Sequence, residues 1–81
     1  MKILFCCHGN ICRSPMAEFV MKKLAAEAGR DDLFVESAAL HTDEIGNDIH
    51  PGTRAQLRAH DVPFVPRAAW LLTANRAKAY D

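Results

Sequence analysis

A short apolar run, followed at once by a polar turn and a helix start signal, constrains the fold of this chain more than any other feature. Residues 3–7 (Ile-Leu-Phe-Cys-Cys) are all apolar, and such a run is typical of a strand buried in a parallel sheet. Ser14 and Pro15 suit the N-cap and the first position of a helix. We therefore predict a strand, a loop over residues 8–13 and then a helix.

The loop and the helix after it have further local signals. Gly9 and Asn10 both tolerate the positive φ angles that a tight, concave loop needs. Gly29 suits the end of the helix. Apolar residues recur at helical spacing between these points and predict one buried face. The predicted face consists of Ala17, Val20, Met21, Leu24, Ala25 and Ala28.

Later segments predict a second strand over Leu33–Ala38, a helix from Pro51 to about Ala59 and a short helix from Thr73 through Tyr80. The fold class is therefore α/β, a parallel sheet with flanking helices. An apolar first strand should have a neighbour on each side, but the chain supplies one. We expect either residues beyond Asp81 to complete the sheet, or self-association through the exposed edge of the first strand.

Composition narrows the function classes. The chain has 81 residues, 10 basic and 10 acidic side chains, and 49% apolar residues, which is typical of one small globular unit. Without a basic excess, neither nucleic acid nor a membrane surface is expected as a partner. The three cysteines lie within seven residues and predict free thiols in a reducing compartment, hence a cytoplasmic protein. The four histidines are too scattered to predict a zinc site.

The loop has the residues of an oxyanion site. Backbone N–H groups in a curled loop converge on one anion, and the helix that follows adds its free N–H groups and dipole. Arg13 can bind two phosphate oxygens with its planar guanidinium. The same positive potential should lower the pKa of the Cys7 thiol, and the Ser14 hydroxyl can donate to the thiolate. The candidate phosphate-binding residues are His8, Gly9, Asn10, Ile11, Cys12 and Arg13.

These residues predict two displacements at phosphorus. Cys7 would attack to form a cysteinyl-phosphate, and water would then release phosphate, with Arg13 stabilising both transition states. No metal and no cofactor is needed, because fixed positive groups do this work. A general acid for the leaving group is the one component that the loop does not supply.

Several segments resemble low-molecular-weight protein-tyrosine phosphatases. The resemblance covers nearly the whole chain and is strongest over Ile3–Glu18, with further similarity at Val35–Ala39, Glu44–Asn47 and Leu71–Asp81. It implies a phosphotyrosine phosphatase I-like (Rossmann-like) fold. It also implies that residues 1–81 are the N-terminal part of a single domain, whose last strands and last helix lie outside this chain.

The resemblance also implies roles for individual residues. Cys7 would be the nucleophile, Arg13 the phosphate clamp and Ser14 the donor to the thiolate. Asn10 would hold the loop, with Ser37 as its partner. Two further loop residues have implied roles: Cys12 would form a reversible disulfide with Cys7, and Ile11 would line the mouth and favour phosphotyrosine over phosphoarginine. Substrates would be phosphotyrosine proteins or small aryl phosphates, and phosphate or sulfate would bind as ligands.

The sequence departs from the family pattern at three places. No Asp is followed by Pro, so the family's general acid is absent from these residues and activity of the chain is expected to be impaired. Asp43 stands near the position of a cleft aromatic, and Pro66 and Ala69 stand where the family often has a His and an Arg. Two alternatives stay open: an inactive remnant that binds oxyanions, and a thiol-dependent arsenate reductase. The latter is disfavoured because no cysteine follows Cys12.

Overall fold

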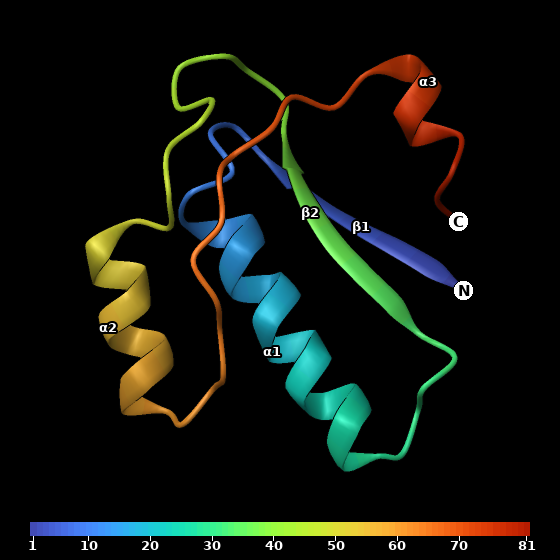
Figure 1. Cartoon of the computed structure of the whole chain (residues 1–81), viewed down its shortest axis with the longest axis vertical. Helices are drawn as coiled ribbons and strands as arrows, with labels where there is room; N and C mark the ends of the chain where they lie inside the picture. Colours follow the sequence, from blue (N-terminus) through green and yellow to red (C-terminus); the bar gives the residue numbers. More distant parts are fainter.

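The computed structural model describes residues 1–81 and has the predicted α/β architecture (Figure 1). A pair of parallel strands lies beside one long helix, and a second helix lies against the first. The elements in order are β1 (Lys2–Cys7), α1 (Arg13–Glu27), β2 (Phe34–Ala39), α2 (Pro51–Ala59) and α3 (Ala74–Ala77). None of these helices combines the length and the hydropathy that crossing a membrane requires.

The sheet places the loop after Cys7 at the carboxyl ends of both strands. β1 and β2 pair in parallel from Lys2 opposite Phe34 to Cys7 opposite Ala39. β1 therefore has one strand neighbour, as predicted. On the edge of β1 away from β2, only the first residue of the strand makes backbone hydrogen bonds. There the N–H of Asp81 donates to the carbonyl oxygen of Lys2 at 2.8 Å, and the N–H of Lys2 donates to Asp81 Oδ2 at 2.7 Å.

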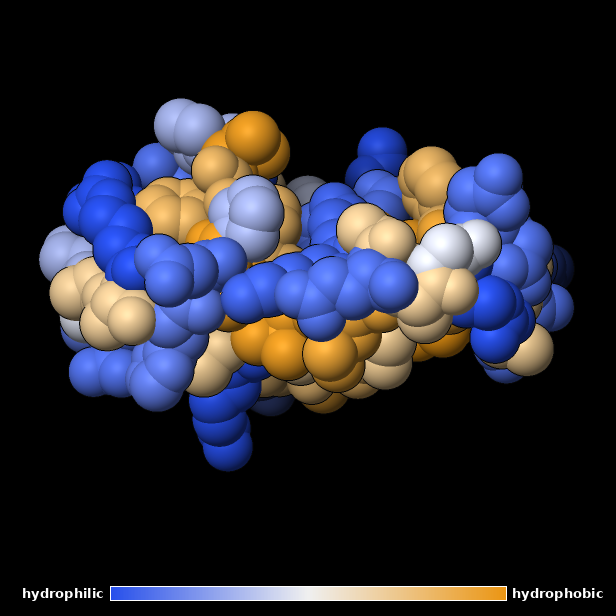
Figure 2. Space-filling model, turned by 90° about the horizontal axis from the view of Figure 1, so that it is seen from below, coloured by the Kyte–Doolittle hydropathy of each residue, from blue (hydrophilic) through white to orange (hydrophobic).

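The hydrophobic core lies between α1, α2 and the chain that follows α2. Its centre is a cluster of Phe19, Ile49, Leu57 and Val62, with Met16 and Phe64 packed against it. The prediction of the buried face of α1 was therefore wrong at three positions. Val20 and Leu24 are 37% and 52% exposed, and Ala28, which follows the last turn, is exposed as well. The helix contributes Met16 and Phe19 to the core instead. Apolar side chains gather on one part of the surface in Figure 2.

The start of α1 also differs from the prediction. The helix begins at Arg13 with Cys12 as its N-cap, and Cys12 makes no side-chain capping hydrogen bond. Ser14, predicted as the cap, is a buried residue in the first turn, because its hydroxyl contacts groups of the preceding loop instead. At the other end Gly29 has φ of +69° and follows the last turn, as predicted.

The remaining elements agree with the sequence within small shifts. β2 begins and ends one residue later than expected, and α2 has the predicted bounds. The side chain of Thr73 caps α3 by accepting from the N–H of Arg76, but α3 ends at Ala77 and not at Tyr80. The hydroxyl of Tyr80 instead donates to Glu36 at 2.8 Å, and the chain leaves the helix before it.

Candidate active site

The loop after β1 curls around the sulfur of Cys7. The N–H of Asn10 points to this sulfur at 3.3 Å, and the hydroxyl of Ser14 lies 3.0 Å from it. Asn10 has φ of +59°, as predicted, but Gly9 does not have a positive φ. Space is tight at Gly9 instead, because a Cβ at this position would lie 3.1 Å from Cγ of Glu44, which would have to shift by a few tenths of an ångström.

These donors change the ionisation of Cys7. Burial works against the thiolate, but hydrogen bonds from the Ser14 hydroxyl and from the N–H groups of Ser14, Asn10 and Gly9 outweigh it, so the pKa of Cys7 is lowered. Cys6, the preceding residue, shows the opposite effect: desolvation and the nearby charge of Cys7 raise the pKa of the Cys6 thiol. The loop thus favours the thiolate form of Cys7 and not that of Cys6.

Asn10 lies at the centre of a buried hydrogen-bond network. Its side-chain Nδ2 donates to Ser14 Oγ at 2.8 Å and to Ser37 Oγ at 2.9 Å. The hydroxyl of Ser37 donates to Glu18 Oε1 at 2.5 Å, and Lys22 donates to the other oxygen of Glu18 at 2.6 Å. The structure therefore joins Cys7 to β2 and to α1 through one continuous chain of polar groups.

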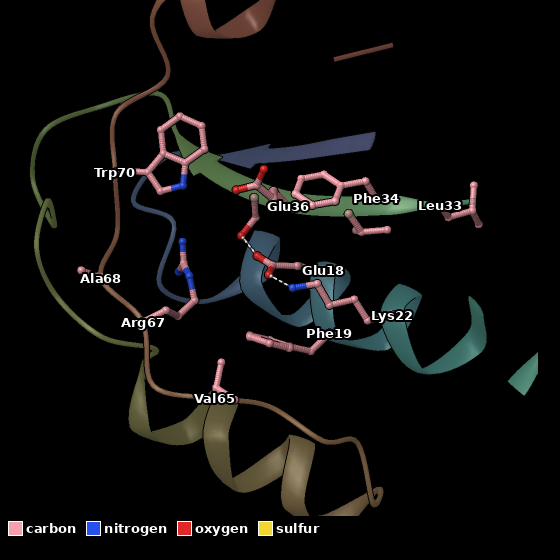
Figure 3. Close-up of a pocket in the computed structure, with 12 residues that line it drawn as sticks. Glu18, Phe19, Lys22, Leu33, Phe34, Glu36, Val65, Arg67, Ala68 and Trp70 are labelled. Atoms are coloured by element: carbon pink, nitrogen blue, oxygen red, sulfur yellow. Dashed lines mark hydrogen bonds and ion pairs between the residues drawn. The ribbon is translucent and has the colours of Figure 1, made fainter. Parts of the chain in front are cut away.

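Arg67 completes the network and was not among the predicted site residues. Its Nη1 donates to the carbonyl oxygen of Asn10 at 2.8 Å, and its Nη2 donates to the Oδ1 of the same residue. Arg67 and Glu18 line a pocket of about 450 Å³ between α1, β2 and the segment that follows α2. Figure 3 shows both side chains in this pocket. Burial lowers the pKa of Arg67, and the negative charges of Glu18, Asp48 and Cys7 oppose that shift, so the guanidinium stays charged.

Two predicted residues face outward at the start of α1. Arg13 is exposed and takes part in none of the ion pairs of the chain, so its guanidinium is available to an anion. Cys12 is also exposed, and its sulfur accepts a hydrogen bond from Thr53 of α2 at 3.2 Å. Ile11 is partly buried, and its carbonyl oxygen accepts from the N–H of His50 at 2.6 Å.

The outer rim of the loop has a second polar cluster. His8 Nε2 lies 2.6 Å from Asp43 Oδ2, and the ring of His41 stacks on that of His8 with centroids 4.1 Å apart. The hydrogen bond and charge of His8 lower the pKa of the Asp43 carboxyl. The side chains of His8 and Asp43 are 55% and 66% exposed, so this pair, unlike the Asn10 network, lies in solvent.

Comparison with known proteins identifies the family. The family model for the low molecular weight phosphotyrosine protein phosphatases matches residues 2–81. The chain belongs to this family. A relative from Staphylococcus saprophyticus, the low molecular weight protein-tyrosine-phosphatase PtpA, is 38% identical over 73 residues, which are 90% of this chain and 47% of the relative. The chain thus spans about half the length of the curated relatives that it matches.

Solved structures of the family have the same fold. The crystal structure of YfkJ from Bacillus subtilis matches with a TM-score of 0.94 and 36% identity, covering 100% of this chain and 52% of that one. A drosophila arginine phosphatase matches with a TM-score of 0.87 and 32% identity, covering 93% of this chain and 47% of that one. The predicted α/β fold of this family is confirmed.

The residues that sequence reasoning missed are far from the loop in the chain. Arg67 lies 57 residues after Asn10, and no local pattern marks it. Asp43 and His41 lie in the irregular segment after β2 and reach the rim only through the fold. Glu18 did have a signal, since it lies one helical turn after Ser14 and therefore on the same face of α1.

Proposed function

We propose that the protein hydrolyses phosphotyrosine monoesters through a cysteinyl-phosphate intermediate. The observation that supports this best is the set of donors around Cys7, which lowers the pKa of its thiol. A thiolate at the base of an N–H-lined loop can attack phosphorus directly, while the free guanidinium of Arg13 lies at the start of the adjacent helix.

The proposed chemistry has two steps. The sulfur of Cys7 forms a bond to phosphorus while the bond between phosphorus and the phenolic oxygen breaks, and the phenolate takes up a proton. Water then attacks the phosphorus of the cysteinyl-phosphate, inorganic phosphate leaves, and the sulfur departs as a thiolate. Arg13 and the loop N–H groups stabilise the equatorial oxygens in both transition states. The Ser14 hydroxyl, 3.0 Å from the sulfur, stabilises the departing thiolate.

The proton for the leaving phenolate needs a separate source. Residues 1–81 contain no Asp-Pro pair, the motif in which this family holds its general acid. We therefore propose that these residues alone turn over substrates with good leaving groups, such as p-nitrophenyl phosphate, and act poorly on phosphotyrosine itself. Substrates with better leaving groups should have a higher kcat, because the leaving oxygen then needs less protonation in the transition state.

The test is hydrolysis of p-nitrophenyl phosphate by the wild type, Cys7→Ser and Arg13→Ala. Both variants should lose turnover, whereas Cys6→Ser, a matched change one residue away, should keep it. An inactive wild type that still binds vanadate or sulfate would favour an oxyanion-binding protein without turnover. Reduction of arsenate by the wild type with a thiol donor would favour a reductase.

We further propose that Ile11 favours phosphotyrosine over phosphoarginine. One solved relative is a drosophila arginine phosphatase, so proteins with this fold include arginine phosphatases as well as tyrosine phosphatases. Ile11 is partly buried, and its carbonyl oxygen accepts from the N–H of His50, just before α2. In this proposal its branched side chain narrows the mouth of the site. Ile11→Thr should lower the ratio of kcat/KM for phosphotyrosine to that for phosphoarginine, and an unchanged ratio would contradict the assignment.

The two loop cysteines are proposed to form a reversible disulfide. Cys12 is exposed, and Cys7 has a lowered thiol pKa, a combination that favours oxidation of Cys7 and capture by a resolving thiol. Peroxide should inactivate the wild type reversibly, with a mass loss of two hydrogens. It should inactivate Cys12→Ser irreversibly. Equal recovery of both proteins under dithiothreitol would contradict this role.

Self-association through β1 is a further proposal. Beyond Lys2, where Asp81 already pairs, the outer edge of β1 has no partner in the chain. Such an edge can pair with a second copy. Light scattering on the purified chain should give a mass above 9.0 kDa that falls on dilution, and a concentration-independent monomer mass would contradict the proposal.

A further inference from the structure

Arg67 contacts the loop from a segment that belongs to neither the strand nor the helix beside it. Its guanidinium donates to the backbone carbonyl of Asn10 at 2.8 Å and also to its side-chain Oδ1. Its own backbone is held in turn, because the N–H of Arg67 donates to Asp48 Oδ1 at 2.9 Å. Arg67 is therefore a fixed group that binds both oxygens of one residue.

A guanidinium has donors and no acceptor, and this fact orients Asn10. Both oxygens of Asn10 must face Arg67, so its side-chain nitrogen must face the other way. On that side Nδ2 lies 2.8 Å from Ser14 Oγ and 2.9 Å from Ser37 Oγ. A reversed amide would place Nδ2 against the donors of Arg67, which buried polar groups do not tolerate.

The orientation of Asn10 then fixes the two hydroxyl protons. Ser14 accepts from Asn10, so its own proton is left to point at the Cys7 sulfur 3.0 Å away. Ser37 likewise accepts from Asn10 and gives its proton to the Glu18 carboxylate at 2.5 Å. The network runs in one direction because a group with donors only stands at one end and an acceptor stands at the other.

We propose that Arg67 is a positioning residue that sets the direction of this network and so commits the Ser14 proton to the Cys7 sulfur. The inference rests on the proposed function only in taking the Cys7 thiolate as the nucleophile. The proposal gives Arg67 an effect on the reactivity of the Cys7 sulfur, although the hydrogen bonds of its guanidinium go to Asn10.

The first test measures the reactivity of Cys7 as a function of pH. The rate of alkylation by iodoacetamide is followed across the pH range, and tandem mass spectrometry assigns the label to Cys7. Arg67→Met should raise the midpoint by roughly one pH unit, equivalent to about tenfold less thiolate below it. Arg58→Met is the matched control, since Arg58 lies over Phe64 at 5.3 Å and touches no loop residue. Equal midpoints in the two variants would overturn the proposal.

A double-mutant cycle separates positioning from simple charge. If Arg67 acts through Asn10 and Ser14, then Arg67→Met should add almost nothing to the midpoint shift already caused by Ser14→Ala. If Arg67 acted only as a nearby positive charge, the two shifts would add. Additive shifts would therefore overturn the assignment, even if the single variant behaves as expected.

Arg67→Lys keeps the test decisive if the methionine variant does not fold. Lysine also has donors only but lacks the planar fork, so it should hold one of the two Asn10 oxygens and give an intermediate midpoint. A midpoint equal to that of the wild type would overturn the need for both contacts.

Alkylation of Cys7 requires no turnover of substrate. A wild type that fails to hydrolyse p-nitrophenyl phosphate would therefore count against the proposed function alone, and additive shifts in an active enzyme would count against the role of Arg67 alone.

Discussion

The loop around Cys7 has an inner side and a rim, and the two are held in different ways. On the inner side Asn10, Ser14 and Ser37 are buried, and no buried side-chain nitrogen or oxygen of the chain lacks a hydrogen-bond partner. On the rim, the His8 and Asp43 side chains are more than half exposed to solvent. A buried polar group that loses its partner cannot turn to water, whereas an exposed one can. The shape of the loop should therefore depend on its inner side.

The largest effect should come from Asn10→Ala. This change removes the side-chain hydrogen bonds to Ser14, Ser37 and Arg67 and forces alanine into a positive φ. The hydrogen bond from Arg67 to the backbone carbonyl of residue 10 remains. We expect the free energy of unfolding to fall by about 2–4 kcal/mol, and kcat/KM for p-nitrophenyl phosphate to fall by roughly 100-fold or more. Urea denaturation and steady-state kinetics measure the two effects.

Asn10→Gly separates the two causes. Glycine accepts φ of +59° without strain but makes no side-chain hydrogen bond, so it should recover part of the stability and little of the activity. If glycine restored both in full, backbone strain alone would explain the loss. The inner network would then have no part in holding the loop.

Ser37→Ala should have the next largest effect. It removes the link between Asn10 and Glu18 and leaves Glu18 Oε1 without its short hydrogen bond. The expected loss is about 1–3 kcal/mol of unfolding free energy and about tenfold in kcat/KM. Thr42→Ala, which removes a hydroxyl from an exposed residue of the neighbouring loop, is the matched control and should change neither quantity. Equal behaviour of the two variants would place Ser37 outside the network.

The parts of the inner side differ in how far the sequence predicts them. The first strand, the curled loop and the first helix all lie within the first 27 residues of the chain. Local signals in this segment were enough to predict a phosphate-binding loop between the strand and the helix. The contact of Arg67 with Asn10 depends on how the chain returns after α2, which no local pattern encodes. Ser14 was misassigned as a cap because a serine before a helix has two uses, and only the positions of Cys7 and Asn10 decide between them.

The ionisation of Cys7 predicts a pH dependence of stability. The pKa of this thiol is lowered in the folded state, so the folded state binds fewer protons than the unfolded state between the two pKa values. The stabilisation is complete above the unfolded pKa of about 8.5 and is lost as the pH falls through the folded pKa. The unfolding free energy of the wild type, relative to Cys7→Ala, should therefore rise with pH in this window. A flat difference would mean that the donors around the sulfur do not favour the thiolate.

The smallest effect should come from the rim, through Asp43→Asn. The pair that Asp43 forms with His8 is 2.6 Å long but solvent-exposed, and pairs of this kind add little to stability. The hydrogen bond and charge of His8 lower the pKa of Asp43, so the carboxylate persists until the pH falls through that lowered value. We expect an unchanged free energy of unfolding and a change in kcat for p-nitrophenyl phosphate of about twofold at most. A loss comparable to that of Ser37→Ala would mean that the rim, and not the buried network alone, holds the loop around the sulfur.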